Sequence, residues 1–230
     1  MIDEDINKLL FFDLETVGVT RDLEQLEQLN PRLFNLWQIN SQYHKRKYPE
    51  DEGLSDNEIF MKRAALTPEY GRIICATFGF INKDGSYKLT SYYGEDEMAI
   101  LKSIQQLLDS IGPKGYYLCG HNVKVFDIPY IGKRLLINGL RPPTILPKHN
   151  TKPWELKVVD TKDMWNFGFN GLSSLELITC LLNIDSPKDG IHGPQVHLGY
   201  WDDGRMEDIK EYCEKDVKAL MDIITKLKSY

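Results

Sequence analysis

Leu9-Leu10-Phe11-Phe12-Asp13-Leu14-Glu15 is an apolar run that ends in two acids placed two residues apart. The run predicts a first strand over residues 9–13. Side chains at i and i+2 of a strand point to the same side, so Asp13 and Glu15 can reach one metal ion together. Without further support, however, an acidic pair at a strand end is more typical of an exposed edge.

Hydrophobic periodicity and turn residues place the other elements. Strands are expected at residues 72–80, 87–93, 116–119 and 156–159, with a hairpin turn at 82–85. Helices are expected at residues 95–108, 128–137, 174–182 and 206–228. A hairpin followed by alternating helices and strands predicts an α/β fold, with a mixed five-stranded sheet of the ribonuclease H-like kind flanked by helices.

Two stretches interrupt this pattern. Residues 20–70 show helical leucine spacing without a strand pattern, and we interpret them as a helical insertion after the first strand. The basic run His44-Lys45-Arg46-Lys47 within it is compatible with phosphate contacts, but three acids follow at 50–52 and favour a solvated charged surface. The prolines between 141 and 153 predict a stiff loop. Residues 1–230 are therefore expected to form one domain with one insertion.

Composition bounds the class of protein. The chain has 230 residues, 42% of them hydrophobic, and a net charge of −6, which argues against a general nucleic-acid coat. Bound metal would neutralise some acids, so the charge does not exclude a metal-dependent enzyme. No apolar stretch approaches the roughly 18 residues that span a membrane, and the acidic start lacks the basic region of a signal peptide. Four widely spaced cysteines without a C-x-x-C pair are expected to be reduced. Together, these observations predict a soluble cytoplasmic protein.

Three further polar residues lie in informative places. Asp127 precedes Ile128-Pro129 and is placed to cap a helix, to act in a functional site, or to do both. Tyr212 and Asp216 share one face of a helix whose other members are apolar. A carboxylate on an inward face is costly unless a cation or donors meet it, so Asp216 favours a functional site.

Three blocks resemble the three motifs of the DEDD exonuclease superfamily: Phe12-Asp13-Leu14-Glu15-Thr16, Gly120-His121-Asn122 with Phe126-Asp127, and Tyr212-Cys213-Glu214-Lys215-Asp216. The tyrosine-containing (DEDDy) branch fits, because the histidine branch would place His where Glu211 stands. The chain is most similar to predicted 3′-5′ exonucleases related to the proofreading domain of family-B DNA polymerases. The blocks 66–73, 186–188 and 189–196 also resemble that group, and the likeness covers nearly the whole chain.

The resemblance implies a metal-dependent 3′-5′ exonuclease that releases nucleoside 5′-monophosphates. Asp13 would bridge two Mg²⁺ ions, with Mn²⁺ as a plausible substitute. Glu15 and Asp216 would complete one ion site, and Asp127 would hold the other through water. Tyr212 would orient the attacking water, because a phenol with a reference pKa of about 10 is a poor base at neutral pH.

The resemblance also implies substrate contacts. Leu14 and Phe126 would contact the terminal bases or sugar, although both are equally compatible with a place in the core. Asn122 would bind the substrate backbone or fix its own turn, and Thr16 would offer a backbone donor. The expected partner is the 3′ end of single-stranded DNA. An RNA-directed exonuclease of the same fold stays open because 2′-hydroxyl contacts cannot be read from the sequence. A non-catalytic nucleic-acid-binding module would not need four acids.

Overall fold

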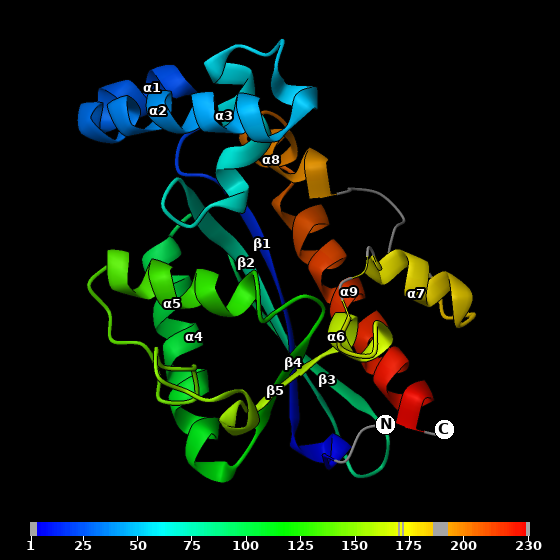
Figure 1. The fold of residues 1–230 in the computed structure, drawn as a ribbon. Coiled ribbons are helices and arrows are strands. Elements are labelled where there is room, and N and C mark those ends of the chain that lie inside the picture. The colour runs from blue at the N-terminus through cyan, green and yellow to red at the C-terminus, as the bar shows by residue number, and fades with distance from the viewer. Residues whose placement is uncertain (1–3, 170, 172, 186–192, 229–230) are drawn as a thin grey trace.

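The computed structural model describes residues 4–169, 171, 173–185 and 193–228, and its centre is a five-stranded sheet of order β3-β2-β1-β4-β5 (Figure 1). The strands are β1 (Leu9–Gly18), β2 (Gly71–Ile81), β3 (Tyr87–Tyr93), β4 (Tyr117–Gly120) and β5 (Val158–Asp160). The central strand β1 runs antiparallel to β2 and parallel to β4. The predicted mixed five-stranded sheet is therefore confirmed.

Helices cover both faces of the sheet (Figure 1). They are α4 (Glu97–Ile111) and α5 (Asp127–Ile137) on one face, and α9 (Met206–Lys228) on the other, with α6 (Thr161–Trp165), α7 (Leu175–Leu181) and α8 (Gly193–Trp201) as shorter helices. The four helices predicted after the hairpin are present, whereas α6 and α8 were not predicted. The predicted end of β1 at residue 13 was wrong, because antiparallel pairing with β2 extends the strand to Gly18.

The side chains of β1 alternate between two cores. Leu10, Phe12 and Leu14 belong to the cluster that α4 and α5 cover. Leu9 and Phe11 belong to the cluster that α9 covers. Because successive side chains of a strand point to opposite faces, the sequence pattern directs Asp13 and Glu15 toward α9.

Gly79 allows α9 to lie close against the sheet. A Cβ atom at this position would overlap the side chain of Met221 and press on Val217, both of α9. The missing side chain thus sets how closely α9 approaches β2.

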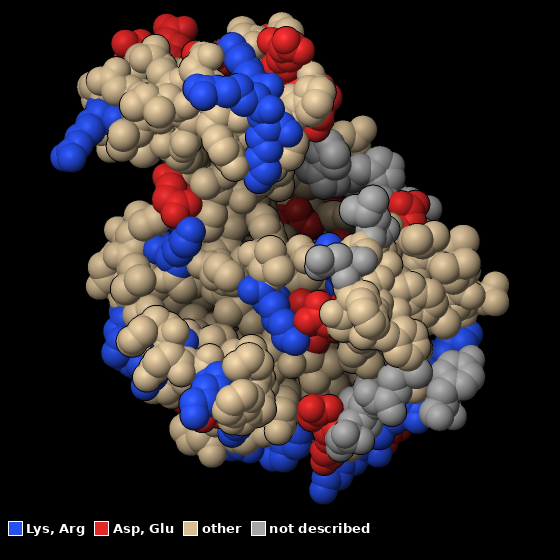
Figure 2. Space-filling model, viewed as in Figure 1, with Lys and Arg blue, Asp and Glu red and all other residues tan. Residues whose placement is uncertain are grey.

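The stretch from 20 to 70 forms a helical lobe at one end of the sheet, made of α1 (Leu23–Leu29), α2 (Pro31–Lys47) and α3 (Asp56–Arg63) (Figure 1). The lobe has its own hydrophobic core, in which Trp37 packs edge-on against Phe60 and Tyr70. The predicted helical insertion is confirmed. Figure 2 shows Lys and Arg side chains over the face of the lobe, and a hollow beneath it with acidic side chains at its bottom.

The predicted reduced cysteines are present as free thiols. Cys75, Cys119 and Cys213 are buried, and Cys180 is exposed. Within the described ranges, none of the helices combines the length and the apolar character that a membrane crossing requires.

Candidate active site

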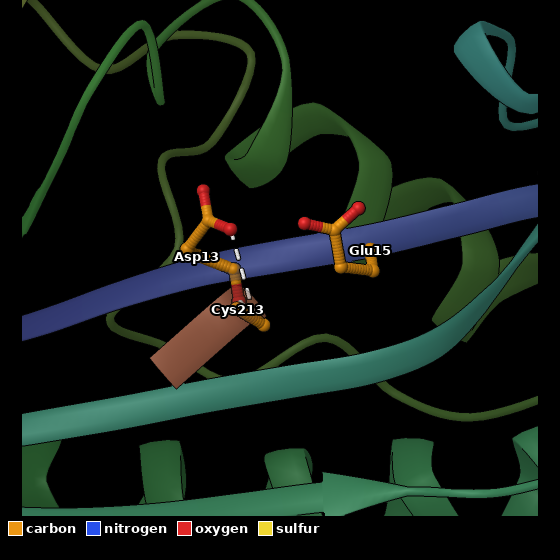
Figure 3. Close-up of side chains that lie close together, drawn as sticks. All are labelled: Asp13, Glu15 and Cys213. Atoms are coloured by element: carbon orange, nitrogen blue, oxygen red, sulfur yellow. Dashed lines mark hydrogen bonds between the residues drawn. The ribbon is translucent and has the colours of Figure 1, made fainter. Parts of the chain in front are cut away.

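The first two acids of the site come from the end of β1 that outruns its neighbour. Parallel pairing with β4 covers Leu9–Phe11, while pairing with β2 continues to Gly18. Asp13 and Glu15 therefore lie where β1 leaves β4, and their carboxyl groups point to the same side of the strand (Figure 3). The pairing with β2 shifts register directly after Glu15. Such bulges increase the local twist and are common beside active sites.

The second contribution comes from α9, whose amphipathic pattern turns Tyr212, Cys213 and Asp216 toward β1. The thiol of Cys213 donates to the backbone oxygen of Asp13 at 3.4 Å and lies 3.6 Å from its carboxylate Oδ2 (Figure 3). Asp216 is buried, and its charge raises the pKa of the neighbouring Tyr212 hydroxyl. The strand and the helix thus present three carboxylates and a phenol to one region.

The fourth acid, Asp127, is the first residue of α5 and only 3% exposed. The predicted capping role was wrong: the helix begins at Asp127 itself, Phe126 occupies the N-cap position, and no side chain caps the helix there. The backbone of Asp127 itself and that of Leu14 lie near the carboxyl group and partly offset the rise in its pKa that burial causes. The start of α5 thus lies beside β1, near the residue between the two acids of that strand.

The electrostatics of the site are those of crowded, buried carboxylates. Burial raises the pKa of Asp13 well above its ordinary value, and the charges of Asp216, Glu15 and Asp127 raise it further. Burial and the charge of Asp216 likewise raise the pKa of Glu15 well above its usual range. Burial raises the pKa of Asp127 to about 7. These mutual effects mean that the four carboxyl groups share one region, whose negative charge calls for a cation.

The donor set fits a hard divalent cation. Ligand atoms of Asp13, Glu15 and Cys213 lie within 4.8 Å of one another. Burial raises the pKa of the Cys213 thiol well above its ordinary value, so this sulfur stays protonated and acts as a donor. Carboxylate oxygens then remain as the ligands, and oxygen ligands are those that Mg²⁺ and Mn²⁺ prefer.

A buried acid that the sequence analysis did not identify holds the turn before α5. Asp160 ends β5, and its carboxylate accepts hydrogen bonds from the backbone N–H groups of Asn122 at 2.9 Å and Lys124 at 3.1 Å. It also caps α6 through the N–H of Lys162. Asn122 has a φ of 62°, an unusual value for a residue other than glycine, and these bonds stabilise it. Asp160 thus fixes the turn that leads to Asp127.

The four residues predicted as substrate contacts have different surroundings in the structure. Leu14 is buried in the core cluster with α4 and α5, which favours the alternative of a core residue. Thr16 donates to the backbone oxygen of Ala65 at 2.8 Å and so fixes the lobe to β1. Phe126 is half-buried against the Tyr130 ring, and Asn122 lies at the edge of a surface cavity. The blocks 186–188 and 189–192 lie outside the described residues.

Comparisons with known proteins agree with this geometry. Residues 65–221 match a family described as "Predicted 3'-5' exonuclease related to the exonuclease domain of PolB". The matched range contains Asp127, Tyr212 and Asp216, whereas Asp13 and Glu15 precede it. A comparison with curated proteins gives no match.

Among 21 matching chains of solved structures is the family B DNA polymerase from the hyperthermophilic archaeon Pyrobaculum calidifontis. The TM-score is 0.59 at 14% sequence identity. The match covers 96% of this chain and 24% of the polymerase chain, so the protein corresponds to about a quarter of the polymerase's length. At this identity the likeness establishes the fold.

Proposed function

The chain belongs to the family of predicted 3′-5′ exonucleases related to the exonuclease domain of PolB, and from this premise we propose that it hydrolyses phosphodiester bonds of single-stranded DNA from the 3′ end by a two-metal-ion mechanism. The products would be nucleoside 5′-monophosphates. One observation carries the proposal: Asp13, Glu15, Asp127 and Asp216 come from three distant segments and influence one another's ionisation in one region.

The four carboxylates are assigned to two Mg²⁺ ions, with Mn²⁺ as a substitute. Asp13, Glu15, Asp127 and Asp216 would hold the ions. When bound, such ions supply Lewis-acid activation of a water molecule and stabilise the departing 3′ oxygen. The protein's own part is rigid placement, since Asp13 and Glu15 lie on a central strand and Asp160 holds the turn that leads to Asp127.

Tyr212 is assigned the orientation of the attacking water. Burial and the neighbouring carboxylates raise the pKa of its hydroxyl above the ordinary value, so the phenol keeps its proton at neutral pH and serves as a donor, not as a base.

Tyr212→Phe is therefore expected to lower kcat by about tenfold and to leave measurable cleavage, as expected for losing one hydrogen bond while the carboxylates remain. Single-turnover rates on a labelled oligonucleotide measure the effect. Tyr93→Phe is a matched control, because it removes a phenol hydroxyl that lies beside a carboxylate, that of Glu207, on the surface. A loss below about 10⁻³ of the wild-type rate would contradict the orienting role.

Asn122 and Phe126 are proposed to contact the last nucleotide, because they lie on the turn directly before Asp127. Thr16 and Leu14 are proposed to act beside them by fixing β1 and its contact with the lobe. The free thiols agree with a reducing compartment, and we propose a cytoplasmic role in DNA repair or nucleotide recycling.

The deciding experiment is a time course on single- and double-stranded DNA and RNA labelled at the 5′ end. With Mg²⁺ we expect stepwise shortening of single-stranded DNA and release of 5′-monophosphates. With EDTA we expect background cleavage, and full recovery when Mg²⁺ or Mn²⁺ is returned. Faster shortening of RNA would replace the DNA assignment by the RNA one. Equal cleavage with EDTA and Mg²⁺ would overturn the metal mechanism.

A further inference from the structure

A cavity of about 320 Å³ opens beside the turn that carries Asp127. Asn122 and Val125 of this turn line one part, and Lys162, Asn166 and Phe169, in and after α6, line another. The turn joins the cavity directly to the acids, because Asp127 follows Val125 by two residues. Whatever binds in the cavity is therefore close to Asp127.

The apolar side chains of the cavity are turned outward. Phe169 is 80% exposed and Val125 is 76% exposed. Phe126, by contrast, packs against Tyr130 with ring centroids 5.3 Å apart. An aromatic side chain that stays in water contributes little to folding, so the ring of Phe169 is free to stack against a flat partner.

The polar side chains are arranged around this ring. The ammonium of Lys162 donates to Oδ1 of Asn122 at 3.2 Å, and Oδ1 of Asn166 accepts from the Ser173 hydroxyl at 2.8 Å. Both contacts use the amide oxygens and so orient the two amide groups. An ammonium has three donors, so Lys162 can meet a phosphate and keep its bond to Asn122. Asp163, on the cavity edge, is paired with Lys124 at 2.9 Å.

We propose that Asn122, Lys162, Asn166 and Phe169 form a stacking platform for an unpaired base of the substrate strand, near its 3′ end. Phe169 stacks on the base, and Lys162 contacts its phosphate. This inference rests on the proposed exonuclease function and adds a substrate-binding site to it. Base pairs cannot stack on the ring while they stay in a duplex, so the platform selects single strands. A base offers the same face in DNA and RNA, so the platform does not discriminate between them.

Phe169→Ala tests the platform, with Phe167→Ala as its matched control. Phe167 is two residues away and 76% exposed, and it is not among the residues that line the cavity. We expect Phe169→Ala to raise KM for a single-stranded ten-nucleotide oligomer about tenfold, as expected for losing one stacked base, and Phe167→Ala to leave KM unchanged. The dissociation constant of a fluorescent oligomer, measured by anisotropy in EDTA, should change by the same factor.

A scan with single abasic sites locates the stacked base. One position near the 3′ end should weaken binding to the wild type but have no further effect on Phe169→Ala, because the two changes remove the same contact.

The outcomes separate the two proposals. Two results overturn the platform and leave the exonuclease proposal standing, provided that the wild type cleaves the oligomer. In one, both Phe variants keep the wild-type KM. In the other, KM rises equally in both variants. Oligomer binding that depends on Phe169 without any hydrolysis overturns the exonuclease proposal and supports the platform. A wild type that fails to bind the oligomer overturns the platform.

Discussion

Asp13→Asn is expected to lower the rate of phosphodiester cleavage by about 10³-fold or more at saturating substrate. Asp13 is the acid that the charges of all three other carboxylates affect. If Asp13 holds metal as proposed, losing this anionic ligand removes several kcal/mol of charge stabilisation in the transition state, and about 4 kcal/mol corresponds to a factor of 10³. Single-turnover rates with Mg²⁺ measure the loss.

The same substitution should stabilise the metal-free protein. Burial and like charges raise the pKa of Asp13 well above its ordinary value, so this carboxyl group loses its proton less readily in the folded protein than in the unfolded chain. The free energy of unfolding therefore falls as pH rises above the ordinary pKa of 3.8, and this destabilisation is present at pH 8. In EDTA at pH 8, Asp13→Asn should raise Tm by about 2 to 4 °C, the shift that about 1 kcal/mol produces in a chain of this size.

Asp203→Asn is the control, since it removes the same charge from an exposed position. We expect it to leave both rate and Tm unchanged. For the wild type, Mg²⁺ should raise Tm, and this increase should be smaller in Asp13→Asn. If metal-free Asp13→Asn has a lower Tm than the metal-free wild type, like charges do not destabilise the site. If the variant cleaves at the wild-type rate, Asp13 is not a metal ligand.

Asp160→Ala is expected to lower kcat by about 100-fold without removing any proposed ligand. The Asp160 carboxylate accepts from the backbone of Asn122 and Lys124 and is 3% exposed. Without it, the turn before Asp127 loses its fixed shape, and a misplacement of about 1 Å in an active site costs roughly 100-fold. Asp160→Asn keeps one acceptor oxygen and should lose less.

Loss of stability alone must be separated from loss of positioning. Asp96→Ala removes the side-chain cap of α4, far along the chain from the proposed acids, at a typical cost of about 1 kcal/mol. Assayed well below Tm, this variant should keep wild-type kcat, whereas Asp160→Ala should not. If the two variants lose activity in proportion to their losses of Tm, Asp160 is a structural residue and not a positioning one.

The sequence allowed the sheet and most helices to be predicted because their signals are local. The run before Asp13, the turn at Asn82–Gly85 and the apolar stripe of α9 each lie within one stretch of chain. The grouping of Asp13, Asp127 and Asp216 was different, because no local pattern joins residues so far apart. It depended on the resemblance to known motifs, and the roles of these acids stay predictions.

The features that were missed depend on contacts between distant residues. β1 continues beyond Asp13 because β2 pairs with it, and the sequence of residues 14–18 contains no pattern that predicts this pairing. Asp160 interacts with backbone groups 36 and 38 residues earlier in the chain, so it has no sequence motif. The capping interpretation of Asp127 failed because a proline two residues later is compatible with a helix that begins at either residue. α6 has five residues, too few to show periodicity.

The place of Asp127 at the first residue of α5 has a geometric consequence. β4 pairs with β1 only as far as Phe11, and beyond that point the start of α5 lies near the Leu14 backbone. The span between the two halves of the site is then set by the reach of one short side chain from a helix start. Glutamate at this position would carry the same charge but would be longer by one methylene, so its carboxylate could not keep its present place.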